Sequence, residues 1–174
     1  GGDPLFATTG YKTSFDDPDQ FYEDLTSLAD TLADAGVRQI SGGIVGDESR
    51  YDATRWVPSW PTRYQIGGTV APLSALLVND GSTGYADTPT EPTANRKAGD
   101  SALLFAQTLR TVLTTRGIKV SGGASTGRAP SDGREIASFD SVPMTEVLSE
   151  MLTNSDNTTA ELVTKEIGLQ AKGQ

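Results

Sequence analysis

One helix-to-strand pattern occurs twice in this chain and constrains its fold more than any other feature of the sequence. LADAGVRQISGG, residues 32–43, and LTTRGIKVSGG, residues 113–123, each contain the end of a helix, a glycine, a short strand and a Ser-Gly-Gly turn. Because each amphipathic helix must cover the face of a sheet, two such units predict an α/β fold made of two similar halves. Duplication and independent use of the same pattern both remain open as explanations.

The first unit is predicted to begin with a helix at Asp17-Pro18. Asp is a favoured N-cap residue, and Pro is favoured at the first helical position. The apolar stripe of this helix, at spacings of three and four, consists of Phe21, Leu25, Leu28 and Leu32. Gly36 is expected to end the helix, and a strand is expected from Val37 to Val45.

Three further helices are predicted downstream. The helix of the second unit carries an apolar stripe from Ala102 to Leu113 and ends at Gly117, before the strand IKVSGG. A third helix is expected over residues 144–154, and its apolar face consists of Met144, Val147, Leu148, Met151 and Leu152. The last helix is expected to begin at Thr158, because Thr158 and Glu161 have the T-x-x-E spacing of a capping box.

The stretch between the two units, residues 48–99, is predicted to be an irregular loop region rich in Pro, Gly, Thr and Trp. Trp56, Trp60 and Tyr64 either line a groove or anchor the loop. The anchor is favoured because large aromatic residues dominate the burial of irregular segments. The part from Asn79 to Asp100 is expected to be an exposed connection.

Composition excludes several classes of function. The chain of 174 residues has 14 Lys plus Arg against 23 Asp plus Glu, a formal net charge of -9, so nucleic acid is not an expected partner. His and Cys are both absent, which removes an imidazole base, a thiolate nucleophile and the usual zinc ligands. We therefore expect no metal and no cofactor. Any catalysis has to use Ser, Thr, Lys, Tyr or carboxylate side chains.

The tripeptide Ser155-Asp156-Asn157 has two interpretations. Ser, Asp and Asn are all favoured N-cap residues, so capping of the last helix accounts for the tripeptide when it is considered alone. Its position between two predicted helices also presents Ser155 and Asn157 on a loop held by rigid elements, as a catalytic site requires.

The order of several segments resembles the D-alanyl-D-alanine carboxypeptidases and endopeptidases among the class C, low-molecular-mass penicillin-binding proteins. The segments that carry the resemblance are Gly1-Gly2-Asp3-Pro4, ISGGIVGD, PSWPTRY, APLSALLVNDG, GIKVSGG, GRAP and EVLSEMLTNSDNTTAELVTKEIG. Such enzymes use three active-site motifs, Ser-x-x-Lys, Ser-x-Asn and Lys-Thr-Gly. Only the middle motif stands here in family order, since no Ser is followed three residues later by Lys and Lys12-Thr13-Ser14 precedes SDN. The chain therefore resembles an internal segment of such an enzyme.

The resemblance implies a serine-type D-Ala-D-Ala carboxypeptidase that acts on peptidoglycan stem peptides through an acyl-enzyme and binds β-lactams. Ser155 would relay a proton to the departing D-alanine, Asn157 would hold the amide carbonyl of the substrate, and Asp156 would orient the loop. Residues 1–138 would form an inserted α/β domain. Residues 139–174 would form the start of a serine β-lactamase/transpeptidase-like domain that carries SDN.

The resemblance also implies a location and partners. The complete enzyme would be exported to the cell wall or periplasm, and this segment would work with the Ser-x-x-Lys and Lys-Thr-Gly segments of the same enzyme. By itself the segment would be inactive, because it has no acylating serine. The alternative is a non-catalytic cell-wall-binding or structural module that uses the aromatic loop around Trp60.

Overall fold

The computed structural model describes residues 1–14, 20–85 and 96–172. Helices and short parallel strand pairs make up an α/β fold, which confirms the fold class predicted from the sequence. Within the described ranges, none of the helices combines the length and the apolar character needed to span a membrane.

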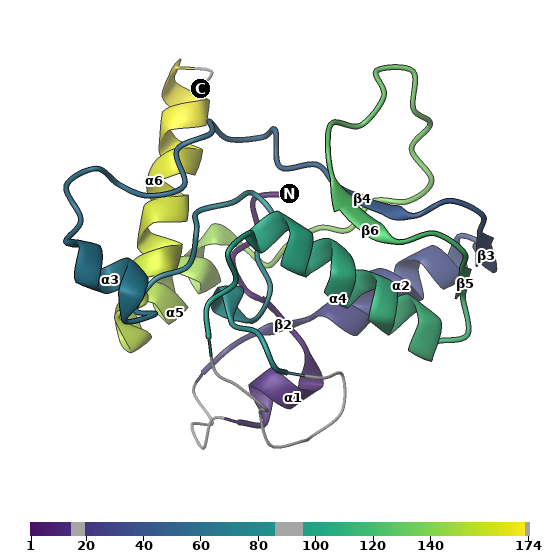
Figure 1. The fold of residues 1–174 in the computed structure, drawn as a ribbon, viewed down its shortest axis with the longest axis horizontal. Helices are drawn as coiled ribbons and strands as arrows, with labels where there is room; N and C mark the ends of the chain where they lie inside the picture. The colour runs from purple at the N-terminus through teal and green to yellow at the C-terminus, as the bar shows by residue number, and fades with distance from the viewer. Residues whose placement is uncertain (15–19, 86–95, 173–174) are drawn as a thin grey trace.

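The two predicted units lie side by side. The first consists of α2 (Leu25–Asp34), β3 (Gln39–Ile40) and β4 (Ile44–Gly46), and the second of α4 (Ser101–Thr115), β5 (Lys119–Val120) and β6 (Ala124–Thr126). β3 pairs in parallel with β5, and β4 pairs in parallel with β6. The helices α2 and α4 of the two units also contact each other (Figure 1). Equivalent elements of the two halves are therefore neighbours. The first predicted strand is split in two at its Ser-Gly-Gly turn, whereas the second contains β5 alone and β6 follows it.

The Ser-Gly-Gly turns let the two halves approach closely. The amide of Gly122 donates to the carbonyl of Gly42 at 2.8 Å, and the amide of Ile44 donates to the carbonyl of Gly123 at 3.0 Å. A Cβ on Gly43 would lie 2.3 Å from the carbonyl oxygen of Gly123, and one on Gly122 would lie 2.6 Å from the amide nitrogen of Gly43. A side chain at either position would push the two backbones apart. One glycine of each turn, Gly43 or Gly122, thus has a steric reason.

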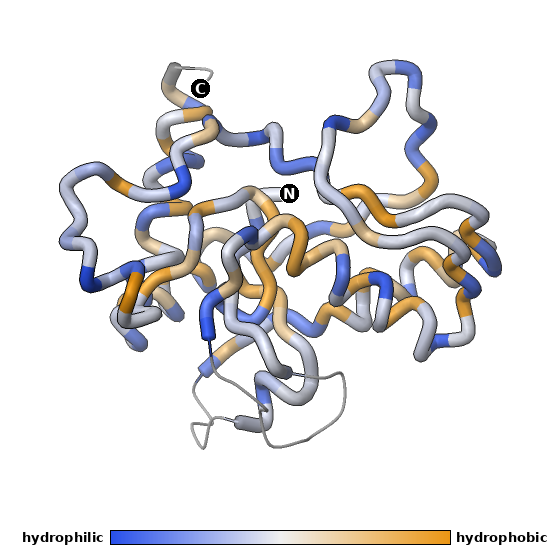
Figure 2. The backbone as a smooth tube through the Cα atoms, in the orientation of Figure 1, coloured by the Kyte–Doolittle hydropathy of each residue, from blue (hydrophilic) through white to orange (hydrophobic). Residues whose placement is uncertain are grey.

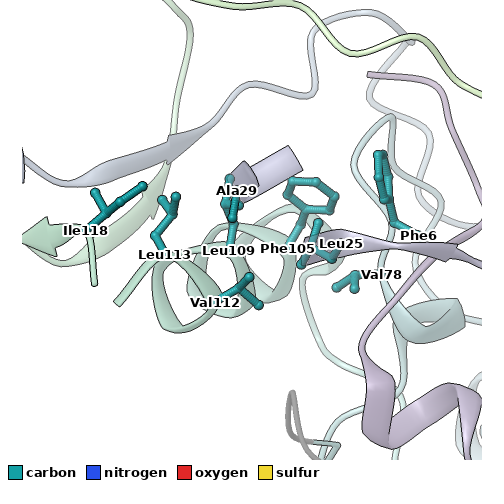
Figure 3. Close-up of a cluster of buried hydrophobic side chains, with 9 residues drawn as sticks. All are labelled: Phe6, Leu25, Ala29, Val78, Phe105, Leu109, Val112, Leu113 and Ile118. Carbon is teal, nitrogen blue, oxygen red and sulfur yellow. The ribbon is translucent and has the colours of Figure 1, made fainter. Parts of the chain in front are cut away.

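The main hydrophobic cluster lies where α2 and α4 meet the strands (Figure 3). Its residues are Phe6, Leu25, Ala29, Val78, Phe105, Leu109, Val112, Leu113 and Ile118. The rings of Phe6 and Phe105 meet edge to face, with their centroids 5.8 Å apart. Apolar and hydrophilic stretches alternate along the helices (Figure 2), as expected for helices that bury one face.

The helix of the first unit begins later than the sequence predicts. α2 starts at Leu25, and the carboxylate of its N-cap Asp24 accepts a hydrogen bond from the amide of Thr26 at 2.9 Å. Residues 20–22 are not helical, so the expected continuation of the helix through Phe21 is wrong. The predicted start at Asp17-Pro18 lies outside the described residues.

Two carboxyl groups meet beside the N-terminal strand pair. β1 (Phe6–Ala7) pairs in parallel with β2 (Glu23–Asp24). Burial, followed by the hydrogen bond with Asp3 and the charge of Asp3, raises the pKa of Glu23 to about 8. Among the described residues, no N–H or O–H donor reaches Asp3 Oδ2 or Glu23 Oε2. Glu23 therefore keeps its proton at neutral pH.

The irregular middle region contains a second apolar cluster and two short helical turns, α3 (Thr62–Ile66) and η1 (Asn79–Gly81). The residues of the second cluster are Tyr51, Ala71, Leu73, Ala75, Leu77 and Leu162. Trp60 packs against this cluster, as the anchor interpretation predicts. Trp56 and Tyr64 are half-buried.

The expectation of an exposed connection from Asn79 onward is wrong at its start. Asn79 is 2% exposed, and Ser82 is buried and bridges to Lys97 in antiparallel orientation. The segment turns into the protein because its backbone and side chains find hydrogen-bond partners there. Residues 86–95 of the predicted connection lie outside the described residues.

The last two helices attach to the middle region through ion pairs on α6 (Asn157–Lys172). The guanidinium of Arg50 donates two hydrogen bonds to the carboxylate of Glu166, at 2.9 and 2.7 Å. The ammonium of Lys165 donates to Asp52 at 2.8 Å. The bidentate pair of Arg50 with Glu166 fixes the direction of the two side chains as well as their distance. It therefore orients α6 on the loop that follows β4.

Helix α5 (Met144–Asn154) has the predicted bounds, but its apolar face is not buried within the described chain. Val147 is buried, whereas Met144 is 47% exposed and Leu152 is 73% exposed. The pattern correctly predicted the helix. It did not show how much of the apolar face this chain covers.

We expect Gly81→Ala to destabilise the protein. A Cβ on Gly81 would lie 2.2 Å from the Cβ of Ala71, and Gly81 has a φ of +67°. The left-handed backbone and the overpacking together should lower the free energy of unfolding by about 2–4 kcal/mol, measured by urea denaturation. Gly99→Ala is the matched control, because a Cβ there meets open space. Equal stability of the two variants would contradict the packing around Gly81.

We also expect Glu23→Gln to raise the melting temperature at pH 8.5 but not at pH 5. The folded protein keeps a proton on Glu23 up to a pKa of about 8, whereas an unfolded Glu releases it near pH 4.3. Stability is therefore lost as pH rises through this window, and Gln removes the loss. Glu135→Gln, at an exposed position whose charge is not among those that raise the pKa of Glu23, is the control for removal of a charge. An unchanged melting temperature at pH 8.5 would argue against a raised pKa of Glu23.

Candidate active site

The predicted site residues lie at the sharp junction between α5 and α6. Ser155 ends α5 in a left-handed conformation, with φ 55° and ψ 41°. Gly is the usual residue at this position because a Cβ is strained there. The amide of Asp156 donates to the carbonyl of Met151 at 3.0 Å and closes the end of α5. Asn157 then begins α6.

Asp156 caps α6 through both of its carboxylate oxygens. Oδ1 accepts from the amide of Thr159 at 3.0 Å, and Oδ2 accepts from the hydroxyl of Thr159 at 2.7 Å. The predicted role of Asp156 as the cap is confirmed. The predicted capping box of Thr158 and Glu161 is wrong, because the helix starts one residue earlier and its cap is Asp156, which accepts from both the amide and the hydroxyl of Thr159.

Ser155 and Asn157 flank this cap with both side chains exposed. Neither side chain makes a hydrogen bond to any part of the chain that the structure describes. The hydroxyl of Ser155 can both donate and accept, and the carboxamide of Asn157 offers two N–H donors and a carbonyl acceptor. The pair is therefore available to a ligand.

Two carboxyl groups with raised pKa values, Glu150 and Asp80, interact with the charge of Asp156 at this junction. Glu150 on α5 is 4% exposed, and its Oε1 accepts from the side-chain amide of Asn154 at 3.2 Å. Burial, with a further contribution from the charge of Asp156, raises the pKa of Glu150 to about 7. Burial also raises the pKa of Asp80 to about 6, although its ion pair with Lys97 acts in the opposite direction.

Sequence reasoning missed Asp80, Lys97 and Glu150. Glu150 stands within an amphipathic helix, where a charged residue is normally solvated. Asn79-Asp80-Gly81 carried a usable signal, because Asn, Asp and Gly are the residues that tolerate left-handed turns. The sequence alone did not indicate that this turn is buried.

The hydroxyl and the carboxamide at the junction are suited to binding a polar ligand and to passing on a proton. Ser155 and Asn157 carry no charge, and the described residues contain no cluster of three or more carboxylates placed to hold a metal ion. A hydroxyl and a carboxamide one residue apart can together bind a peptide group and pass on a proton. The nucleophile would have to come from another segment.

Comparison of the sequence with known proteins links this chain to one family. The model of the D-Ala-D-Ala carboxypeptidase 3 (S13) family matches residues 10–95 and 86–174. Carboxypeptidase DacB of Mycolicibacterium smegmatis is 28% identical over 145 residues, 82% of this chain and 29% of that protein. The D-alanyl-D-alanine carboxypeptidase of Actinomadura sp. strain R39 is 23% identical over 222 residues, with coverage of 90% of this chain and 41% of that protein. The chain thus spans less than half the length of either relative.

The capping role of Asp156 can be measured with two variants. Asp156→Ser keeps a side-chain acceptor, whereas Asp156→Ala has none. Both remove the negative charge near Glu150 and Asp80, so their difference isolates the cap. We expect the Ser variant to be more stable than the Ala variant by about 1 kcal/mol in urea denaturation. Identical free energies of unfolding would show that the cap contributes nothing.

Proposed function

We propose that this chain, which belongs to the D-Ala-D-Ala carboxypeptidase 3 (S13) family, supplies the Ser-x-Asn part of the active site of a serine-type D-Ala-D-Ala carboxypeptidase. One observation carries the assignment. Asp156 caps α6, while the exposed side chains of Ser155 and Asn157 on either side make no hydrogen bond within the described ranges. Capping explains one residue of the tripeptide and leaves the other two for function.

The reaction begins with a serine from another segment of the enzyme. Its oxygen attacks the carbonyl carbon of the terminal D-Ala-D-Ala amide, the C–N bond breaks, and an acyl-enzyme forms. Ser155 passes the serine proton towards the departing D-alanine nitrogen. Asn157 holds the amide carbonyl of the substrate by donating from its carboxamide. Water then hydrolyses the ester and releases the shortened peptide.

The proposed domain boundary lies at residue 139, between an inserted α/β domain and the segment that carries SDN. The two halves of the repeat pair with each other within residues 1–138, which supports an insertion with its own sheet. The exposed Met144 and Leu152 on α5 support packing of the second segment against further polypeptide. We assign that polypeptide to the regions with Ser-x-x-Lys and Lys-Thr-Gly.

The substrates and location follow from the same proposal. The complete enzyme takes peptidoglycan peptides that end in D-Ala-D-Ala and is acylated by β-lactams, which mimic that amide. Such substrates lie outside the cytoplasm, so the enzyme is exported to the cell wall or periplasm. The alternative of a non-catalytic wall-binding module is weaker, because Trp60 packs against the second apolar cluster instead of standing free.

Acylation of the full-length enzyme by labelled penicillin tests the assignment. Ser155→Ala and Asn157→Ala should each slow acylation about 10²-fold, the effect of removing one positioned polar group from an active site. Melting temperatures should stay close to that of the wild type, because neither side chain is bonded within the described fold. Wild-type acylation rates in both variants would refute the roles given to these residues.

The isolated 174 residues provide a second test of the missing nucleophile. No Ser in them has a Lys three positions later, so labelled penicillin should leave no covalent adduct. Intact-mass measurement after incubation is the readout. A stoichiometric adduct would show that this segment carries its own acylating residue.

A further inference from the structure

The loop that follows β4, residues 47–55, contacts α6 through two adjacent side chains; we call it the β4 loop. The guanidinium of Arg50 donates to both oxygens of the Glu166 carboxylate, at 2.9 and 2.7 Å. The hydroxyl of Tyr51 donates to Oε2 of the same carboxylate at 2.9 Å. Two neighbouring residues of the β4 loop therefore converge on one carboxylate of the helix that begins at SDN.

A second ion pair joins the β4 loop to α6 one residue earlier on the helix. The ammonium of Lys165 donates to Oδ1 and Oδ2 of Asp52, at 2.8 and 2.9 Å. Asp52 is itself fixed within the loop, because its Oδ1 also accepts from the amide of Thr54 at 2.6 Å. Consecutive residues of a helix point about 100° apart around its axis. The contacts at positions 165 and 166 therefore oppose rotation of α6 about its axis as well as its displacement.

The β4 loop is also fixed on the side away from α6. The carboxylate of Glu48 accepts from the hydroxyl of the buried Ser74 at 2.7 Å and pairs with Arg55. Oδ2 of Asp47 accepts from the amide of Ala129 at 2.7 Å, in the segment that follows β6. The loop is thus attached to the α/β repeat, and its contacts transmit the position of the repeat to α6.

These contacts select the face of α6 that is turned inward. Residues spaced by three or four lie on the same face of a helix. The inward face consists of Thr158, Thr159, Leu162, Lys165 and Glu166. Asn157 begins α6 five residues before Leu162, which places it about 140° away around the axis. The exposed side chain of Asn157 therefore points away from the inward face, and any rotation of α6 changes its direction.

The stability of the fold is a weak reason for the contacts of Arg50. Its side chain is 40% exposed, and exposed ion pairs contribute little to the free energy of unfolding. A bidentate pair instead fixes direction. With the proposed domain boundary at residue 139, the β4 loop belongs to the inserted α/β domain and α6 belongs to the segment that carries SDN. The contacts therefore cross from one to the other.

We propose that Arg50, Tyr51 and Asp52 are positioning residues through which the inserted α/β domain sets the rotation of α6 and so the direction of the SDN side chains. This inference rests on the proposed function of Ser155 and Asn157. It gives the insertion, which carries none of the proposed catalytic residues, a part in the reaction.

The test uses the full-length enzyme and its acylation by labelled penicillin, with the binding constant and the first-order acylation rate constant measured separately. Arg50→Ala removes the bidentate pair, whereas Arg50→Lys keeps the charge without the paired geometry. Arg50→Ala should lower the acylation rate constant about 10-fold, and Arg50→Lys should lower it less, because small displacements of positioned groups are costly in catalysis. A wild-type rate constant in Arg50→Ala would overturn the proposal.

Arg116→Ala is the matched control for the loss of an ion pair. Arg116 pairs with Asp30 at 2.6 Å between α4 and α2, and its side chain is 38% exposed, close to the value for Arg50. This variant should leave the acylation rate constant unchanged. An effect as large as that of Arg50→Ala would show that any lost ion pair slows the enzyme, and the proposal would fall.

A double-mutant cycle with Asn157→Ala tests the route of the effect. If Arg50 acts by directing Asn157, its removal should matter much less once that side chain is gone, and the effect of Arg50→Ala should fall from about 10-fold to about twofold. Fully additive effects would contradict a route through SDN. Melting temperatures identify any variant that fails to fold. In that case Glu166→Gln, which keeps the shape of the acceptor, tests the same contact and should also slow acylation.

The outcomes separate this inference from the proposed function. If the wild-type enzyme is acylated and Ser155→Ala is slow while Arg50→Ala is normal, only the positioning role is wrong. If the wild-type enzyme is not acylated, or Ser155→Ala reacts normally, the assignment of the SDN site is wrong and the positioning role is wrong with it.

Discussion

The burial of the first turn of α6 against the middle of the chain is the contact on which the candidate site depends. Thr158, Thr159 and Leu162 face inward, and Leu162 joins the second apolar cluster. Because α6 begins at Asn157, the last residue of SDN, anything that fixes this turn also fixes the tripeptide. Arg50 with Glu166 and Lys165 with Asp52 hold the rest of the helix in the same orientation.

Local rules of stability are broken in a small region around this contact. Ser155, Asn79 and Asp80 adopt left-handed conformations, and Glu150 and Asp80 place carboxyl groups where water is largely excluded. Elsewhere the elements agree with their sequences: α4 has a buried stripe, and the repeated glycines stand where two backbones meet. Such a concentration of exceptions is what physical reasoning expects at a site selected for chemistry.

The sequence predicted α4 and α5 well because their apolar periodicity is long and their ends are marked. It misplaced the start of α2, since Asp17-Pro18 and Asp24 both resemble helix starts and the pairing of β1 with β2 decides between them. It also missed the buried turn at Asn79. A turn signal states which backbone angles are favoured and says nothing about what lies on top of the turn.

The sequence by itself determined the α/β class, the repeated unit and the break between the last two helices, because all of these depend on local patterns. It also marked Ser155 and Asn157 as the candidate site residues. Only the tertiary structure showed that the carboxylate of Asp156 caps α6. The side chains of Ser155 and Asn157 make no hydrogen bond to the residues that the structure describes. Only the tertiary structure also paired Asp80 with Lys97. Burial and charge proximity arise from contacts between segments far apart in the chain, and no local pattern encodes them.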